Sequence, residues 1–204
     1  MKKLTSGEKM ALKIGIAGPV GSGKTSLIES LTNVLKDKYS LGIVTNDIYT
    51  TEDANYLKKT LDLDENRILG VETGGCPHTA IRDDISMNQK AVVELEEKFN
   101  PDIIFVESGG DNLSATFSYE LIDYYLYVID VAQGADIPRK KGAGLLFSDL
   151  LVVNKTDLAP YVGVDLEQMK EDVANNRKNK PSLFITNKDE KSLEKLVEWL
   201  EVLL

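Results

Sequence analysis

GPVGSGKT, residues Gly18 to Thr25, is the most informative stretch of this 204-residue chain for predicting its fold. It matches the pattern G-x-x-x-x-G-K-[ST] in full, after an apolar run at Leu12 to Ala17 and before an amphipathic segment at Lys24 to Lys38. The glycines let the backbone bend so that successive N–H groups face phosphate oxygens. Lys24 adds positive charge for the β and γ phosphates, and the Thr25 hydroxyl can bind Mg²⁺. The stretch therefore predicts a strand, a phosphate-binding loop and a helix that together bind a nucleotide.

The rest of the chain continues this alternation of apolar runs with longer amphipathic segments, which is typical of a parallel sheet covered by helices. Most runs are continuous Val, Ile and Leu, as expected for strands buried on both faces. The expected strands are Leu12 to Ala17, Leu41 to Thr45, Ile68 to Val71, Ile103 to Glu107, Tyr124 to Val131, Leu150 to Val153 and Ser182 to Ile185. The expected helices are Lys24 to Lys38, Thr79 to Phe99, Asp165 to Arg177 and Lys191 to Leu204. We expect one α/β domain over residues 1–204, a three-layer P-loop NTPase fold with a mostly parallel central sheet of about seven strands.

The composition of the chain argues against several classes of protein. The chain is 42% hydrophobic, which is enough for a core, and no stretch approaches the roughly 20 apolar residues of a membrane helix. A formal net charge of -9 argues against nucleic acid or an anionic membrane as a partner, because both attract clusters of Lys and Arg. The opening residues carry charge without an apolar segment behind them, so we expect a cytoplasmic protein.

The sequence NKTD, Asn154 to Asp157, follows the expected strand at Leu150 to Val153 and is typical of guanine recognition. The Asp157 carboxylate can accept two hydrogen bonds from guanine N1 and N2, which adenine cannot supply, while the stem of Lys155 packs along the base. A buried carboxylate left unpaired against adenine would be costly. Thr186 to Lys188 are candidates to close over the base from the other side. We therefore expect GTP rather than ATP.

Acidic residues follow or end three further strands, at Asp47, Glu72 and Glu107. Carboxylates at neighbouring strand ends beside a phosphate loop are natural Mg²⁺ ligands and can orient the attacking water, and we favour Asp47 and Glu72 over Glu107. Within ESGGDN, Glu107 to Asn112, the glycines at 109 and 110 let the backbone approach a γ-phosphate.

No glutamine stands out for positioning the water, and Arg82 and Arg139 are the only candidate charge stabilisers we can name. Slow intrinsic GTP hydrolysis is therefore expected.

The only cysteine and the only histidine of the chain, Cys76 and His78, lie two residues apart in ETGGCPHTAIRDD. A thiolate and an imidazole are metal ligands, but two ligands do not complete a site. A four-ligand site requires a second copy related by a two-fold axis, which suits Ni²⁺ in a square plane or Zn²⁺ in a tetrahedron. A small buried cysteine beside a helix start is the structural alternative.

Taken together, GPVGSGKT, TNDIYT, VETGGCPHTAIRDD, ESGGDNL, YVIDVA and SDLLVVNKTDLAPYVG resemble the urease accessory GTPases of the UreG family over nearly the whole chain. The resemblance implies a GTPase that uses GTP and Mg²⁺ to form a homodimer, carries Ni²⁺ on Cys76 and His78, and passes it with other urease accessory proteins to apo-urease. It also implies Mg²⁺ and switch roles for Thr25, Asp47 and Glu72, catalytic roles for Lys24, Asp47 and Glu72, and guanine reading by Asn154, Lys155 and Asp157. The expected nucleotide contacts are Gly18, Pro19, Val20, Gly21, Ser22, Gly23, Lys24, Thr25, Ser26, Gly109, Asn154, Lys155 and Asp157.

The sequence departs from the usual family pattern at Lys140 to Gly144, around Phe147 and at ITNKDEKSL, which weakens the assignment of Thr186 to Lys188. Three alternatives stay open. A hydrogenase nickel-insertion GTPase usually has an extra Cys and His cluster that is missing here. An interaction switch could carry an incidental metal site. A small-molecule kinase would need an Arg-rich lid, and NKTD argues against ATP.

Overall fold

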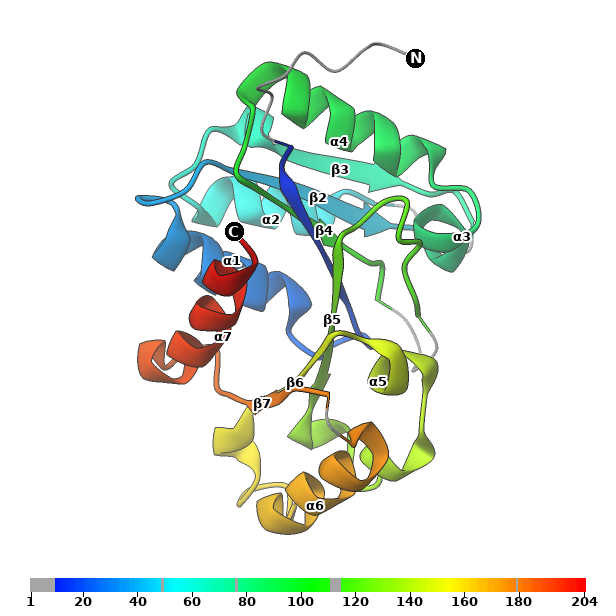
Figure 1. Ribbon diagram of the computed structural model, residues 1–204, viewed down its shortest axis with the longest axis vertical. Helices are drawn as coiled ribbons and strands as arrows, with labels where there is room; N and C mark the ends of the chain where they lie inside the picture. The colour runs from blue at the N-terminus through cyan, green and yellow to red at the C-terminus, as the bar shows by residue number, and fades with distance from the viewer. Residues whose placement is uncertain (1–9, 49, 76, 111–114, 179) are drawn as a thin grey trace.

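The computed structural model describes residues 10–48, 50–75, 77–110, 115–178 and 180–204 and contains seven strands in one sheet. The strands are β1 (Leu12–Ala17), β2 (Leu41–Asp47), β3 (Ile68–Glu72), β4 (Ile103–Glu107), β5 (Tyr124–Asp130), β6 (Leu150–Asn154) and β7 (Ser182–Phe184). The helices are α1 (Lys24–Leu35), α2 (Glu52–Thr60), α3 (Pro77–Arg82), α4 (Ser86–Phe99), α5 (Ala143–Phe147), α6 (Leu166–Arg177) and α7 (Glu190–Leu203), with four short 3₁₀ turns between elements (Figure 1).

The strand order is β3-β2-β4-β1-β5-β6-β7, and every neighbouring pair is parallel. All seven expected strands are present, and the prediction of a parallel α/β sheet is confirmed. β1 has β4 on one side and β5 on the other, so the chain reverses its direction of travel across the sheet at β1. Ligands of such sheets bind beyond the carboxyl ends of the strands at this switch point, which is where the phosphate-binding loop follows β1.

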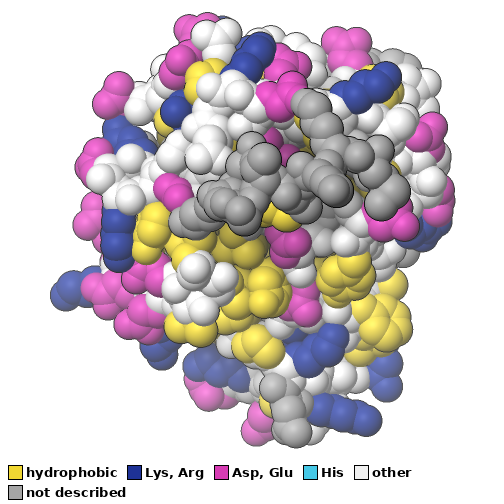
Figure 2. Space-filling view, turned by 45° about the horizontal axis from the view of Figure 1, so that its top comes forward, with side chains coloured by type: hydrophobic (Ala, Val, Ile, Leu, Met, Phe, Trp, Pro, Cys, Tyr) yellow, Lys and Arg dark blue, Asp and Glu magenta, His cyan; other side chains and the backbone are white. Residues whose placement is uncertain are grey.

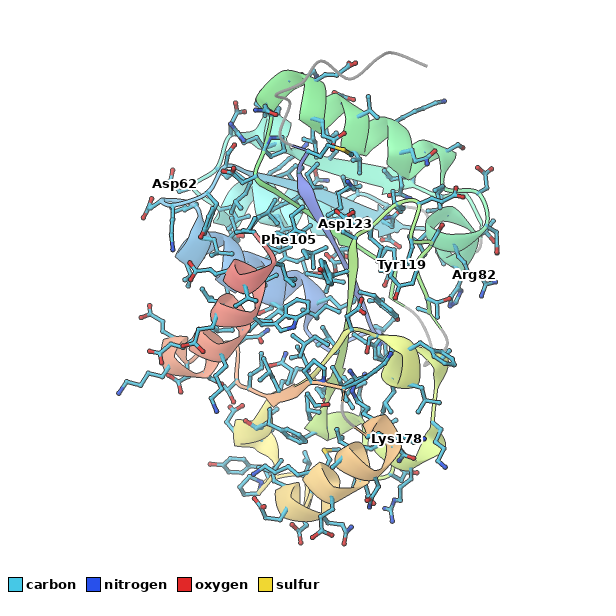
Figure 3. All side chains as sticks on the ribbon, in the orientation of Figure 1. Asp62, Arg82, Phe105, Tyr119, Asp123 and Lys178 are labelled. Carbon is cyan, nitrogen blue, oxygen red and sulfur yellow. The ribbon has the colours of Figure 1, made fainter. Side chains whose placement is uncertain are left out.

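Along the central strands, side chains alternate between two buried layers. Ile103 and Phe105 face one layer, where α1, α2 and α7 cover the sheet, while Ile104 and Val106 face the layer formed with α4, α5 and α6. Phe105, labelled in Figure 3, is fully buried in the first layer. Because β4 is apolar on both faces, its sequence is a continuous apolar run rather than an alternating one.

The expected helix from Thr79 to Phe99 is wrong in one respect, because the structure has two helices there. The amides of Asp83 and Asp84 both donate to Thr79 O, which ends α3, and the Asp84 side chain accepts from the Ser86 amide at the start of α4. An aspartate that bonds nearby backbone amides competes with the helix interior. The apolar spacing continues across the break, so periodicity alone could not reveal it.

Helix α2 and the short helix α5 were not predicted. α2 is only nine residues long and mostly polar, with Ala54 and Leu57 as its buried residues. Its ends did carry a signal, because Glu52 and Asp53 lie in the first turn and Lys58 and Lys59 in the last, as the helix dipole favours.

The distribution of charged side chains on the visible surface agrees with the expectation drawn from the net charge. On the face shown in Figure 2, Lys and Arg side chains are interspersed with Asp and Glu rather than gathered into one basic patch. Within the described part of the chain, none of the helices has both the length and the apolar character needed to cross a bilayer.

Candidate functional site

The carboxyl ends of the parallel strands bring the predicted polar residues to one edge of the sheet. In the strand register Asp47 lies opposite Glu72, Thr45 lies opposite Glu107, and Asp130 lies opposite Asn154. Glu107 is also the partner of Ile16 on β1, directly beside the start of the phosphate-binding loop. The strand order therefore explains why residues far apart in sequence converge around this loop.

The loop itself has the backbone that its glycines predict. Gly23 precedes α1 with a φ of 92°, and a Cβ there would lie 2.6 Å from Asn154 Nδ2. A Cβ at Gly18 would lie 2.1 Å from Val128 O. A side chain at either position would collide with the neighbouring strands, so the close packing of the loop on β5 and β6 requires glycine. The amino-terminal end of α1 is thereby placed at the switch point, where its dipole favours phosphate.

The residue that contacts the Thr25 hydroxyl is Glu107. Thr25 Oγ1 donates to Glu107 Oε1 at 2.7 Å, and Glu107 is completely buried. Among the described residues, the other carboxylate oxygen, Oε2, has no hydrogen-bond partner. A buried carboxylate oxygen beside the hydroxyl of the phosphate loop fits a hard divalent cation such as Mg²⁺. Sequence reasoning gave Glu107 the lowest weight of the three carboxylates, because it could not show that β4 pairs with β1.

Burial raises the pKa of Glu107 from 4.5 to about 7. The positive charge of Lys24 and the hydrogen bond from Thr25 oppose this increase in pKa, whereas the negative charges of Asp53 and Asp47 add to it. The site therefore concentrates negative charge that a bound cation would neutralise.

Asp47 and Glu72 lie in two connected loops. Asp47 accepts hydrogen bonds from the Ile48 amide at 2.6 Å and from the Thr50 hydroxyl, so its carboxylate also orders the start of the loop after β2. The Thr73 amide donates to Asp47 O at 2.9 Å, and the Gly74 amide donates to Ile48 O at 3.1 Å. The segment that leaves Glu72, which is exposed, is therefore fastened to the segment that leaves Asp47.

A pocket of about 200 Å³ lies where the sequence predicts the guanine base. Asp157 Oδ1 accepts a hydrogen bond from Thr186 Oγ1 at 3.0 Å, and Asn187 Nδ2 donates to Gly23 O at 3.3 Å. The segment from 186 to 188, which the sequence assigned only weakly, thus lies against both the predicted base-reading carboxylate and the phosphate loop. The pocket is lined by Gly23, Ser26, Asn154, Lys155, Asp157, Leu158, Thr186, Asn187 and Lys188.

Asn154 and Lys155 connect this pocket to the phosphate loop. Asn154 is buried and donates through Nδ2 to Ser22 O at 3.0 Å, while Lys155 Nζ bonds Gly21 O and lies 3.1 Å from Asp130 Oδ2. These contacts make Asn154 a support of the loop. Asp130, a buried carboxylate at the end of β5, was not predicted as part of the site. Its position at the end of the strand in YVID was the available signal.

The remaining predicted residues belong to other elements or lie outside the described part of the chain. His78 is the second residue of α3 and is half-buried, whereas Cys76 lies outside the described residues, as does the part of the Glu107 to Asn112 segment beyond residue 110. Gly110 approaches the phosphate loop, since a Cβ there would lie 2.6 Å from Val20 Cγ2. Of the two candidate charge stabilisers, Arg82 pairs with Asp83 at the outer edge of α3 (Figure 3), and Arg139 lies 3.4 Å from Asp172 on α6.

A complete phosphate loop at the switch point of an all-parallel sheet defines a P-loop nucleotide-binding protein. Residues 12–184 match the family described as CobW/HypB/UreG, nucleotide-binding domain. The urease accessory protein UreG of Aliarcobacter butzleri (strain RM4018) is 84% identical over 195 residues, which cover 96% of this chain and 100% of that protein. The chain therefore belongs to the CobW/HypB/UreG family and, within it, to the urease accessory proteins UreG.

Solved structures agree with this fold. The hydrogenase maturation factor HypB from Archaeoglobus fulgidus matches with a TM-score of 0.75 and 24% identity, covering 95% of this chain and 90% of that one. HypB from Helicobacter pylori, solved in complex with nickel, matches with a TM-score of 0.70 and 24% identity over 93% of this chain and 85% of that one.

Proposed function

We propose that the chain, acting as one domain over residues 1–204 in the cytoplasm, is a GTP hydrolase that couples GTP binding and hydrolysis to Ni²⁺ delivery during urease maturation. One observation carries the coupling. The segment that runs from Glu72 toward His78 is hydrogen-bonded to the loop after Asp47, through Thr73 and Gly74. A change at the phosphate side of the site therefore acts directly on the segment that leads to Cys76 and His78.

GTP is the nucleotide that the pocket favours. Asp157 offers its carboxylate at a pocket next to the phosphate loop, where the N1–H and the 2-amino group of guanine can donate to it. Lys155 is positioned by Asp130 so that its stem can lie along the base.

Mg²⁺ would be held by the Thr25 hydroxyl together with carboxylates from Glu107, Asp47 and Glu72. When bound, the ion supplies charge neutralisation at the β and γ phosphates. Lys24 adds its charge at the start of α1, and the backbone at Gly109 and Gly110 can approach the terminal phosphate.

Gln133 does not supply the missing group that would position the attacking water, because it donates to Val20 O at 3.2 Å and accepts from the Asp130 amide. Intrinsic hydrolysis is therefore slow, and partner proteins stimulate it.

Ni²⁺ is the cargo in this proposal, and Cys76 and His78 are its ligands. Each chain supplies one thiolate and one imidazole, so a GTP-dependent homodimer completes a four-ligand site across its two-fold axis. Zn²⁺ suits the same ligands in a tetrahedral arrangement. The close identity to a urease accessory protein supports apo-urease and the other urease accessory proteins as partners.

Replacing Cys76 with alanine separates a metal carrier from a pure interaction switch. We expect Cys76→Ala to keep its affinity for a non-hydrolysable GTP analogue within about twofold, because Cys76 is not among the residues expected to contact the base or the phosphates, while nickel binding falls at least about 100-fold. Equilibrium dialysis with ⁶³Ni and urease activation in a reconstituted mixture are the measurements. Thr79→Ala, on the exposed surface of α3, is the matched control and should retain both. A Cys76→Ala chain that still activates urease at the normal rate would favour the switch.

A further inference from the structure

Two buried asparagines connect the nucleotide end of the sheet to the helix that carries His78. Asn46 is 1% exposed at the end of β2, and Asn88 is 0% exposed on α4. Their amides pair reciprocally, because Asn46 Nδ2 donates to Asn88 Oδ1 and Asn88 Nδ2 donates to Asn46 Oδ1, both at 2.8 Å. Nothing in the sequence marked either residue as functional.

The second N–H of each side-chain amide donates a hydrogen bond to the backbone of another element. Asn46 Nδ2 also donates to Glu107 O at 2.9 Å, and Asn88 Nδ2 also donates to Ala80 O at 2.9 Å. The two amides thus have a partner for every N–H they carry, and both carbonyl oxygens are used. A fully satisfied polar network in a buried site has a defined geometry, because any displacement leaves a desolvated group unpaired.

At one end the network meets the cation site. Glu107, whose carbonyl accepts from Asn46, holds the Thr25 hydroxyl through its side chain, and Asp47 directly follows Asn46. A movement of the ends of β2 or β4 in response to the terminal phosphate therefore displaces the amide of Asn46.

At the other end the network holds the carboxyl-terminal part of α3. The last carbonyls of a helix have no partner within the helix, and here Asn88 satisfies Ala80 O while the Ser118 amide satisfies Ile81 O at 2.9 Å. α3 has only six residues, so fixing Ala80 also fixes the position of His78, two residues earlier. The geometry points to Asn46 and Asn88 as positioning residues that transmit the nucleotide state to His78 on α3, an inference that rests on the proposed function.

The test is the ratio of two nickel affinities, measured with and without Mg²⁺ and a non-hydrolysable GTP analogue. In the unmodified chain the nucleotide is expected to tighten nickel binding about 5- to 100-fold, the usual range of coupling between two sites. Asn88→Ala should bind the analogue within about threefold of the unmodified chain, yet its nickel affinity ratio should fall at least about threefold, since α3 is no longer held to the end of β2 through Asn46. The part of the ratio that remains is what the backbone bonds of Thr73 and Gly74 to the loop after β2 transmit.

Asn176→Ala is the matched control. Asn176 lies on α6 and its Nδ2 likewise donates to a distant backbone carbonyl, Pro138 O at 3.0 Å, far from the strand ends of β2 and β4. It removes a side-chain bond to a distant carbonyl, costs less stability because Asn176 is only half-buried, and should leave the ratio unchanged. An unchanged ratio in Asn88→Ala, or an equal loss in Asn176→Ala, would overturn the inference. A ratio near one in the unmodified chain would instead count against the proposed function.

Hydrogen exchange gives a second readout, and its first measurement needs only the unmodified chain. In the unmodified chain, binding of the GTP analogue should slow exchange of the amides of α3 as well as those at the end of β2. In Asn88→Ala the β2 response should persist and the α3 response should become smaller. α3 amides that ignore the nucleotide in the unmodified chain, while its nickel affinity responds, would show that the signal travels by another route.

Discussion

Replacing Asp157 with asparagine is expected to lower the affinity for GTP about 100-fold or more and to create a preference for xanthosine triphosphate. The carboxylate accepts from N1–H and from the 2-amino group of guanine, and a hydrogen bond to a charged group contributes about 1.5–3 kcal/mol. Asparagine offers one acceptor and one donor, which match the N1–H and the 2-oxo group of xanthine. Titration of fluorescent GTP and XTP analogues against both chains measures the two affinities.

Asp189→Asn is the control for this experiment. Asp189 caps α7 by accepting from the Lys191 amide at 3.2 Å, so its replacement removes the same charge near the pocket without touching the pocket lining. It should leave both affinities nearly unchanged. If Asp157→Asn weakened GTP and XTP equally, Asp157 would be a structural partner of Thr186 rather than the residue that reads the base.

Replacing Glu107 with glutamine should weaken nucleotide binding and at the same time stabilise the fold. We expect Mg²⁺-dependent GTP binding to weaken about 10- to 100-fold, because a neutral amide cannot supply the charge that faces the cation. The same change should stabilise the nucleotide-free protein at neutral and higher pH. Glutamine keeps the shape of the side chain, and the Thr25 hydroxyl retains an acceptor in its amide oxygen.

The stabilisation has a defined pH dependence. The pKa of Glu107 is about 7 in the folded chain and 4.5 in its ordinary state, so between these values the folded chain binds more protons than the unfolded chain. The free energy of unfolding therefore falls as pH rises through this window, by up to about 3 kcal/mol, and stays level above it. Glu107→Gln removes this slope.

Urea unfolding of the Mg²⁺-free and nucleotide-free protein between about pH 5.5 and 8 measures the effect. Glu72→Gln, which changes an exposed carboxylate at the end of the neighbouring strand β3, should leave the slope as it is. Parallel slopes for the Glu107→Gln chain and the unmodified chain would show that burial does not penalise this carboxylate.

Much of the fold follows from the sequence because the strands are buried on both faces. Continuous apolar runs such as Leu150 to Val153 stand out from their surroundings, and the structure changes their ends by only one or two residues. The short, mostly polar helix α2 could not be found this way, because it buries too few apolar residues to give a period. The break before α4 depends on local bonds of Asp83 and Asp84, which periodicity does not report.

The residues of the candidate site also fall into two groups, those that could be predicted from the sequence and those that could not. Lys24, Thr25 and Asp157 could be predicted because phosphate and guanine chemistry fixes residue type and spacing within one short segment. The importance of Glu107, Asp130 and Asn46 depends on which strands are neighbours, and strand order is set by packing across the whole sheet. The sequence could place these residues at strand ends but could not show what they face.

In the proposed function, two chains complete one nickel site only when both hold GTP. Native mass spectrometry of the protein with Mg²⁺ and a non-hydrolysable GTP analogue, with and without Ni²⁺, reads the mass of the assembly and its metal content together. We expect dimers that form with the analogue and carry one nickel ion per two chains, while nucleotide-free chains stay single and bind nickel weakly. A single chain that holds its own nickel ion tightly, with or without the nucleotide, would contradict it.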